Sequence, residues 1–430
     1  MQPKRIITNK IPALKTLLKT FVFFLFAVVL NTSVQAQNGR GCTDKSAKNY
    51  DVSAVVNDGS CQYKPVVYNP PFKYLLPEKV KETSGLIYYD NALWTINDSG
   101  NPAVLYRLDP LTGSVTGSIK VSNAENHDWE ALAQDKDHIY IGDFGNNKGN
   151  RNDLQIIKIA KKDLPASGNG QVEATFIWFS YPDYPGHIDK RKNNNFDCES
   201  MICVGDSLYL FSKNWQNSRT RLYSLPVKEG EYSARLLDEF NSRGLITGAD
   251  YNENTEEITL VGYTNKTWLP FLWLLSDFKD QHFFSGNKRR IDMLNIPATQ
   301  TEGIAYTNGR QCVITSEGRK IFTQTAYGLN TEKWLGENDT AETATPEITA
   351  VPNPMNGKYL FIEINHAVKG TYTVKLISEN GELAGTKNIH VKHEDRPANT
   401  KFRITRLKPG NYQVQVTSGT HVYDLKCIKP

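Results

Sequence analysis

The chain has 430 residues, of which 39% are hydrophobic and 22% are charged, so it can bury a sizeable core and is neither disordered nor fibrous. The formal net charge is +4, but five bases and no acid lie in the first 36 residues, and the rest of the chain is close to neutral. A nearly neutral chain lacks the basic surface that nucleic-acid binding requires, which excludes that class.

The N-terminus predicts export. A basic stretch precedes ten apolar residues, Phe21 to Leu30, and a small-residue site follows at Val34 to Ala36, so we expect residues 1–36 to be a cleaved signal peptide. The alternative is a membrane anchor, but a bilayer core of about 30 Å needs roughly 20 apolar residues of helix. We therefore expect a secreted or cell-surface protein with no transmembrane helix in the mature chain, in a compartment where disulfides persist.

Residues 37–64 form a small polar module. Cys42 and Cys61 flank a segment with almost nothing to bury, so we expect a disulfide between them, worth about 3 kcal/mol by loop closure. Four side chains offer oxygens that could hold calcium or could instead form Asx turns: Asp44, Asp51, Asn57 and Asp58. The motif Gly-Cys-Thr-Asp, Asn-Tyr and Asp-Gly-Ser-Cys resembles a module that recurs at the start of secreted bacterial surface proteins, with Lys48 where that family often has a cysteine.

The other four cysteines give no evidence for a metal or redox centre. On one strand, Cys198 and Cys203 would lie about 16 Å apart, beyond the roughly 7 Å that a disulfide allows. Cys312 and Cys427 are isolated in the sequence, and no Cys-x-x-Cys pair is present. We expect these thiols to be small buried hydrophobes.

A similar sequence pattern recurs five times between Lys81 and Trp334. Each copy has an anchor residue at its start and an apolar run nine or ten residues later, which is the pattern of a hairpin. The anchors are Ser84, Glu130, Glu199, Gly248 and Glu302. A third run, and mostly a fourth, follows in each copy, which predicts a β-propeller of five or six blades over residues 65–336. The last copy lacks a fourth run, and Phe72 to Leu75 could supply that strand and close the ring.

The strand rhythm resembles that of secreted, calcium-dependent propellers, which include phytase-like and gluconolactonase-like proteins. This resemblance implies calcium as a cofactor.

Propeller geometry places the start of strand one and the end of strand two of every blade on the same face. Candidate catalytic residues there are Glu130, Glu199, Glu302, His127 and Asp143. Candidate ligand-binding residues are Lys190, Arg191, Lys192, Asp98 and Lys213. The three glutamates could hold calcium or supply an acid and a base, but equivalent residues of repeats also often bond the backbone of a neighbouring blade.

The basic residues belong to a long insert, Tyr181 to Asn195. A long loop in a compact domain is usually functional or disordered. Above an acidic rim, its basic run would suit an anionic ligand held through a cation, such as a phosphate or an acidic sugar; the alternative is a solvated surface. The sequence contains no Gly-x-Ser-x-Gly, P-loop or dinucleotide-binding motif.

Residues 337–347 are polar and predict a linker, and residues 348–430 alternate as in a small antiparallel β-sandwich. Val-Pro-Asn-Pro from Val351, Gly-Thr-Tyr from Gly370 and Gly-Asn-Tyr from Gly410 resemble the type IX secretion C-terminal sorting domain. That family implies passage through the periplasm, recognition by the outer-membrane translocon, and removal of the domain or its attachment to surface polysaccharide. The ending Lys-Cys-Ile-Lys-Pro departs from the family pattern.

The sequence therefore predicts an all-β protein, a five- or six-bladed propeller followed by a small antiparallel sandwich. We expect an exported protein that binds an extracellular glycan or protein at the central polar face. The alternatives are a calcium-dependent hydrolase of phosphate esters or lactones, and a structural envelope protein.

Overall fold

The computed structural model describes residues 39–188, 190–293, 296, 299–319, 322–335, 346–351, 353–355, 357–365, 367, 369–392, 398–419 and 421–430. The predicted signal peptide, residues 337–345 of the predicted linker, Asp189 of the insert and Pro352 of the sorting motif lie outside these residues. The regular secondary structure of the described part is almost wholly β-strand, which confirms the all-β prediction. Its helical segments are η1 (Glu78–Val80), η2 (Lys161–Asp163), η3 (Phe283–Ser285) and α2 (Glu332–Leu335). None of them is long and apolar enough to cross a membrane.

The chain divides into two compact units. Of the described residues, one unit comprises those up to Lys64 together with Asp277–Lys288, and the other comprises those of Pro65–Ser276 and Arg289–Pro430. In the first unit, β1 (Arg40–Gly41) pairs in parallel with β2 (Val56–Asn57). The predicted disulfide between Cys42 and Cys61 is confirmed.

Three short turns of the form Asp-x-Ser shape the N-terminal module. The Oδ1 atoms of Asp44, Asp51 and Asp58 accept hydrogen bonds from the backbone N–H two residues later, at 2.8, 2.9 and 3.0 Å. These are Asx turns, one of the two interpretations that the sequence left open. The hydrogen bonds from Ser53 and Ser60 lower the pKa of Asp51 and of Asp58, so both carboxylates already have donors.

The module also bonds to the segment Asp277–Lys288 of its own unit. Asn57 Nδ2 donates to Asp277 Oδ2 at 2.7 Å and to Asn287 Oδ1 at 2.9 Å, and Thr43 Oγ1 donates to Asp277 Oδ2 at 3.0 Å. Gly59 has a positive φ of +76°, and a Cβ there would lie 2.5 Å from the backbone oxygen of Ser285. Glycine is therefore required at this contact.

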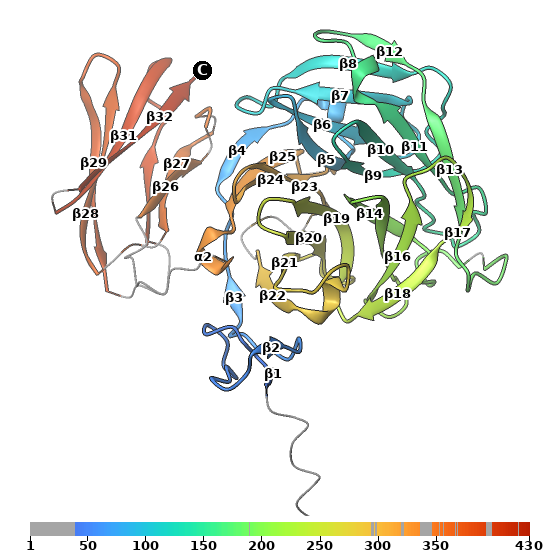
Figure 1. Ribbon diagram of the computed structural model, residues 1–430. Helices are drawn as coiled ribbons and strands as arrows, with labels where there is room; N and C mark the ends of the chain where they lie inside the picture. The colour runs from blue at the N-terminus through green and yellow to red at the C-terminus, as the bar shows by residue number, and fades with distance from the viewer. Residues whose placement is uncertain are drawn as a thin grey trace, which may run out of the picture. The chain divides into compact units, whose positions relative to one another are not determined.

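Five sheets of four or five strands follow one another along the second unit (Figure 1). The first contains β5 (Thr83–Tyr89), β6 (Ala92–Asn97), β7 (Val104–Leu108), β8 (Val115–Val121) and the added strand β12 (Gly170–Val172). The second contains β9 (Trp129–Gln134), β10 (His138–Asp143), β11 (Gln155–Ala160), β13 (Thr175–Ser180) and the added strand β17 (Gly230–Ser233). The third contains β14 (Cys198–Val204), β15 (Ser207–Ser212), β16 (Thr220–Pro226) and β18 (Arg235–Phe240).

The remaining two sheets take strands from both ends of the repeat region. The fourth contains β19 (Leu245–Asn252), β20 (Glu257–Tyr263), β21 (Pro270–Ser276), β22 (Asn287–Asp292) and the early strand β3 (Val66–Val67). The fifth contains β23 (Thr301–Asn308), β24 (Gln311–Ser316), β25 (Thr325–Asn330) and the early strand β4 (Phe72–Leu75). Each of the five predicted repeats thus supplies one sheet.

The five sheets surround a common centre, which makes this part of the chain a β-propeller (Figure 1). The innermost strand of each sheet, its first, contacts the innermost strand of the next, and β23 contacts β5. Apolar side chains fill the space between neighbouring sheets: Trp94 packs with Ile139, for example, and Tyr140 packs with Leu210. The last sheet meets the first in the same way, where Val313 and Ala326 pack with Leu93.

Every innermost strand carries a β-bulge close to its start. The strand register skips one residue in each of the five sheets: Gly85, Glu130, Glu199, Thr247 and Glu302. A bulged residue leaves the regular alternation of the strand, so its side chain can point in a direction that pairing would forbid. The predicted anchors coincide with the bulge in three sheets and precede or follow it by one residue in the other two.

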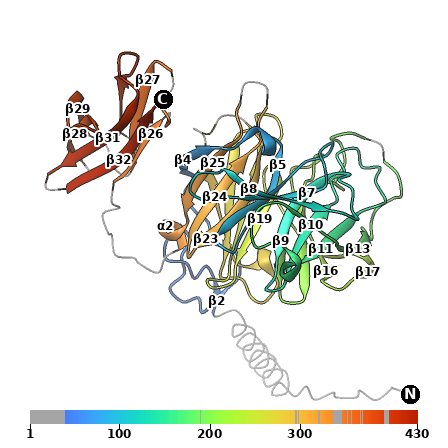
Figure 2. The ribbon, with the colours of Figure 1, turned by 90° about the horizontal axis from the view of Figure 1, so that it is seen from above.

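The predicted pairing of Phe72–Leu75 with the last repeat is observed, since β4 is antiparallel to β25 (Figures 1 and 2). Tyr74 fixes this strand. Its ring is buried against Gly113, where a Cβ would lie 2.4 Å from Tyr74 Cδ2, and its hydroxyl donates to the oxygen of Pro110 at 3.2 Å.

The C-terminal segment contains two sheets that share one core. The first consists of β26 (Glu347–Val351), β27 (Tyr359–Asn365) and β30 (Ala398–Arg403); the second consists of β28 (Gly370–Ser378), β29 (Leu383–Val391), β31 (Gly410–Ser418) and β32 (His421–Lys429). Leu360 and Ile362 of the first sheet pack with Val374 and Val414 of the second. Their pairings are antiparallel, as the alternating pattern predicted.

The four other cysteines are free thiols. Cys198, Cys312 and Cys427 are buried, as expected for small hydrophobes, whereas Cys203 is only partly buried.

If β4 holds the last sheet to the first, Tyr74→Ala should destabilise the propeller by about 3 kcal/mol, the usual cost of removing a large buried aromatic ring. Tyr74→Phe keeps the ring and loses one hydrogen bond, so it should cost about 1 kcal/mol. Urea unfolding of both variants measures the difference. Equal stability of Tyr74→Ala and the wild type would show that the pairing contributes nothing.

Candidate functional site

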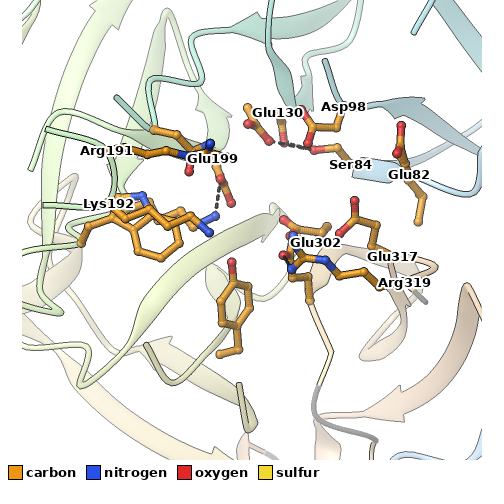
Figure 3. Close-up of a pocket in the computed structure, with 16 residues that line it drawn as sticks. Glu82, Ser84, Asp98, Glu130, Arg191, Lys192, Glu199, Glu302, Glu317 and Arg319 are labelled. Atoms are coloured by element: carbon orange, nitrogen blue, oxygen red, sulfur yellow. Dashed lines mark hydrogen bonds and ion pairs between the residues drawn. The ribbon is translucent and has the colours of Figure 1, made fainter. Parts of the chain in front are cut away.

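A cavity of about 130 Å³ lies at the centre of the ring. Its walls carry the bulged residues Glu130, Glu199 and Glu302, together with Ser84 beside the bulge of β5. The residues at or just after the end of each second strand add Asp98, Lys213, Tyr263 and Glu317. Figure 3 shows the carboxylates of Glu130, Glu199 and Glu302 arriving from different sides of one opening.

Lys213 and Glu199 form an ion pair inside this cavity. Both side chains are only 3% exposed, and Lys213 Nζ donates a short hydrogen bond to Glu199 Oε1. The ammonium also lies over the rings of Trp215 and Tyr263, at 4.8 and 5.4 Å from their centroids. Burial lowers the pKa of Lys213, but the nearby Glu199, Tyr263 and Glu302 together raise it by more. The pKa of Lys213 is therefore well above its ordinary value.

Glu199 and Glu302 are buried but accept few hydrogen bonds. Gln300 Nε2 donates to Glu302 Oε1 at 2.7 Å. Among the described residues, no N–H or hydroxyl donor reaches Oε2 of Glu199 or Oε2 of Glu302, although a hydrogen bond between the two carboxyls lowers the pKa of Glu302. A buried carboxylate without donors is costly, so these oxygens favour a proton or a ligand that donates.

Burial and mutual repulsion raise the pKa of several carboxyls around the cavity. Burial, Glu199 and Asp98 raise the pKa of Glu130 well above its usual value. Burial raises the pKa of Glu302 to about 7, against the opposing effect of Lys213. Burial, with help from Glu302 and Asp98, raises the pKa of Glu317 to about 8. Near neutral pH, part of this set is therefore protonated.

The small side chains Ser84 and Thr247 have the alternative role that the sequence left open, because each bonds to the backbone of a neighbouring sheet. Ser84 Oγ donates to the backbone oxygen of Glu130 at 2.9 Å, and Thr247 Oγ1 donates to that of Thr301. The side chains of Glu199 and Glu302 instead bond to Lys213 and Gln300. The bulged glutamates are therefore directed at the cavity, while the hydroxyl residues hold the sheets together.

His127 and Asp143 do not line the cavity. Asp143 is fully buried, and His127 Nδ1 lies 3.1 Å from its Oδ2. Asp143 Oδ1 also accepts the backbone N–H of Asp128 at 3.0 Å, and Arg151 Nη1 lies 3.1 Å away. This network shapes the loop that leads into β9, so both residues act on the site through Asp128 and Glu130.

The insert holds two of the predicted basic residues at the cavity. Its backbone bonds to the loop at Asn147, where Lys192 N donates to Asn147 O at 2.8 Å. Arg191 and Lys192 line the cavity; Lys190 does not. The ammonium of Lys192 lies 4.6 Å from the ring centroid of Trp215, whose Nε1 donates to the buried Asp197 at 2.6 Å.

Sequence reasoning missed six lining residues: Glu82, Trp215, Tyr263, Gln300, Glu317 and Arg319. Tyr263 and Glu317 stand at the end of the second strand in the fourth and fifth repeats. Asp98 and Lys213 hold the same place in other repeats, so the repeat alignment, extended by two or three residues, was the available signal.

Two carboxylate sets are possible cation ligands. Oxygens of Asp98, Asp128 and Glu130 lie within 4.8 Å of one another. This set fits a hard cation in donor type but offers three residues to an ion that takes six to eight oxygens. The predicted set of Glu130, Glu199 and Glu302 fits less well, because the Lys213 ammonium already supplies a positive charge at Glu199.

No family model matches the chain, and no curated protein matches it. Among solved structures, an exo-β-1,3-galactanase from Phanerochaete chrysosporium is 11% identical, with a TM-score of 0.40, covering 84% of this chain and 99% of the other. A putative 6-phosphogluconolactonase from Bacteroides uniformis is 14% identical, with a TM-score of 0.30, covering 79% and 91%. A GH43_1 enzyme from Xanthomonas citri is 13% identical, with a TM-score of 0.34, covering 62% and 89%. At these values, the matches assign no activity to the chain.

The pair of Lys213 and Glu199 gives a prediction about stability. Lys213→Met leaves Glu199 buried without its cation and should cost about 3 kcal/mol or more. The double variant Lys213→Met/Glu199→Gln removes both charges and should recover much of that loss. Urea unfolding measures the cycle, with Lys120→Met on an exposed strand position as control. A single variant as stable as the wild type would contradict the ion pair.

Glu302 gives a pH prediction. Its pKa is about 7 in the fold and near 4.5 ordinarily, so the fold disfavours the ionised form. The contribution of Glu302 to stability is therefore present below about pH 4.5 and is lost as the pH rises through 7. Because the wild type loses this contribution and Glu302→Gln does not, the free energy of unfolding of Glu302→Gln should rise relative to that of the wild type between pH 5 and pH 8. Denaturant unfolding at four pH values tests this, with the exposed Glu253→Gln as control; parallel pH profiles for Glu302→Gln and the wild type would contradict the raised pKa.

Proposed function

We propose that this chain is an exported, five-bladed β-propeller protein that binds a glycan in its central cavity. The observation that carries the proposal is a pair of buried oxygens, Oε2 of Glu199 and Oε2 of Glu302, that no N–H or hydroxyl donor of the described residues reaches. Both side chains are more than nine-tenths buried, and both line the cavity. Sugar hydroxyls are donors of the kind that such oxygens need.

The size and chemistry of the cavity favour a sugar over the other predicted ligand, a protein. A specific protein interface buries about 800 Å² on each partner, which a cavity of about 130 Å³ does not offer. The lining consists almost entirely of charged and hydroxyl-bearing side chains. Among the described residues, its aromatic side chains are Trp215 and Tyr263. A hydroxyl-rich ligand matches this lining.

Export, the type IX machinery as partner and a cell-surface or secreted location remain part of the proposal. The Cys42–Cys61 disulfide supports them, because disulfides persist in oxidising compartments. In this proposal, the two C-terminal sheets form the sandwich that the sorting machinery recognises.

Titration calorimetry with neutral hexoses and their β-linked disaccharides tests the proposal. At least one sugar should bind, and Glu302→Gln and Glu199→Gln should weaken it at least about tenfold, since each loses an acceptor. Glu253→Gln, an exposed change away from the cavity, should bind as the wild type does. Absence of binding to every sugar, or equal binding by all variants, would overturn the proposal.

A calcium-dependent hydrolase is the second candidate, supported by the oxygen cluster of Asp98, Asp128 and Glu130. Glu302 and Glu199 would then be available as a paired acid and base. Release of nitrophenol from nitrophenyl glycosides and phosphate esters, with calcium and then with a chelator, distinguishes the two. Turnover that is lost with the chelator and in Asp128→Asn would favour the hydrolase, whereas sugar binding without turnover favours the binding protein.

A further inference from the structure

Positively charged side chains from three distant segments meet at the mouth of the cavity. Arg191 and Lys192 come from the insert, Lys213 follows β15, and Arg319 follows β24. Burial lowers the pKa of Lys192, and the nearby charges of Lys213, Arg319 and Arg191 lower it further. These like charges therefore lie close enough to repel one another.

Three of these cations, Arg191, Lys192 and Arg319, lack the ion pairs that other cations of the protein form. Arg221 pairs with Asp183 and Glu239, and Arg310 pairs with Glu257 and Glu332. Within the described residues, no ion pair is found for Arg191, Lys192 or Arg319. Arg319 Nη1 does donate to Gln300 Oε1, and its charge lowers the pKa of Glu317. Grouped like charges cost free energy that an anionic ligand would offset.

Aromatic rings hold two of these cations in place. Lys192 Nζ lies 4.6 Å from the ring centroid of Trp215 and 5.6 Å from that of Trp268. The Arg319 guanidinium lies 4.6 Å from the Trp268 centroid. The Trp268 ring is itself stacked on Tyr263, with centroids 5.2 Å apart and planes 11° apart. The two cations are thus fixed beside one ring rather than free in solvent.

Arg191 and Lys192 lie together at the cavity, whereas Arg319 lies beside Glu317 and Glu302 (Figure 3). Figure 3 shows Arg191 and Lys192 on one side, with Glu82, Asp98 and Glu317 across the opening from them. The donor-seeking oxygens of Glu199 and Glu302 lie between. A ligand that fits both sides has one anionic group and several hydroxyls on a compact ring.

From this layout we infer that the cavity takes the terminal hexuronic acid of a glycan, its carboxylate against Lys192, Arg191 and Arg319 and its hydroxyls on Glu199 and Glu302. This inference rests on the proposed function and narrows its ligand class. A guanidinium binds a carboxylate with two parallel hydrogen bonds, which gives orientation as well as affinity. The anion contacts the protein directly, unlike the cation-bridged anion that the sequence suggested.

Calorimetric titration of the mature chain with glucuronate and galacturonate, against glucose and galactose, tests the inference. A hexuronate should bind at least about tenfold more tightly than its neutral counterpart. Lys192→Gln and Arg319→Gln change exposed side chains, so the fold should be retained, and each variant should abolish this ratio. Lys190→Gln, next to the site but outside the lining, is the matched control.

The outcomes separate the two proposals. Neutral sugars that bind as tightly as hexuronates would overturn the inference and leave the glycan proposal standing. Absence of binding to any sugar would overturn both. Acetate that binds as tightly as a hexuronate would overturn the inference as well, because the ring hydroxyls would then contribute nothing. Added salt should weaken hexuronate binding and leave neutral sugar binding nearly constant.

Discussion

The β-bulge near the start of each innermost strand is the constraint on which the centre of this protein depends. A regular strand alternates its side chains between the two faces of a sheet, and both faces here are packed against neighbouring sheets. One extra residue breaks that alternation and allows its side chain to point into the central cavity. In three sheets, the extra residue is a glutamate, and all three glutamates line the cavity.

Charge compensation then determines what the cavity can do. Glu199 has a cation in Lys213, and burial raises the pKa of Glu199 itself as well as that of Glu130, Glu302 and Glu317. Oε2 of Glu199 and Oε2 of Glu302 still have no N–H or hydroxyl donor among the described residues. This is why the geometry favours a hydroxylated ligand over a metal held by the three glutamates.

The repeats made much of the fold predictable. Five copies of one strand phrase supplied the five sheets, and the missing fourth strand of the last copy pointed to Phe72–Leu75. The added strands β3, β12 and β17 are two to four residues long and carry no alternation that a sequence pattern could reveal. They pair in parallel with distant segments, so only tertiary packing specifies them.

Site residues at equivalent positions of the repeats could be predicted from the sequence, whereas site residues in the loops could not. Glu130, Glu199, Glu302, Asp98 and Lys213 follow directly from equivalent positions in the repeats. His127 and Asp143 have suitable chemistry, but hydrogen bonds turn them into supports for a loop. Arg319 and Trp215 lie at the cavity because of loop conformations that no spacing rule encodes.

The pairing of β4 with β25 also has a consequence for how the chain reaches its native state. Leu76 and Gln324, whose side chain donates to the Leu76 oxygen, are 248 residues apart in sequence. A ribosome releases β4 early, so this strand waits without a partner while four sheets are synthesised. It is four residues long and has an exposed lysine at Lys73, which are features that protect a lone edge from pairing with other chains. The last sheet is thus completed by a strand that is synthesised before the innermost strand of any of the five sheets.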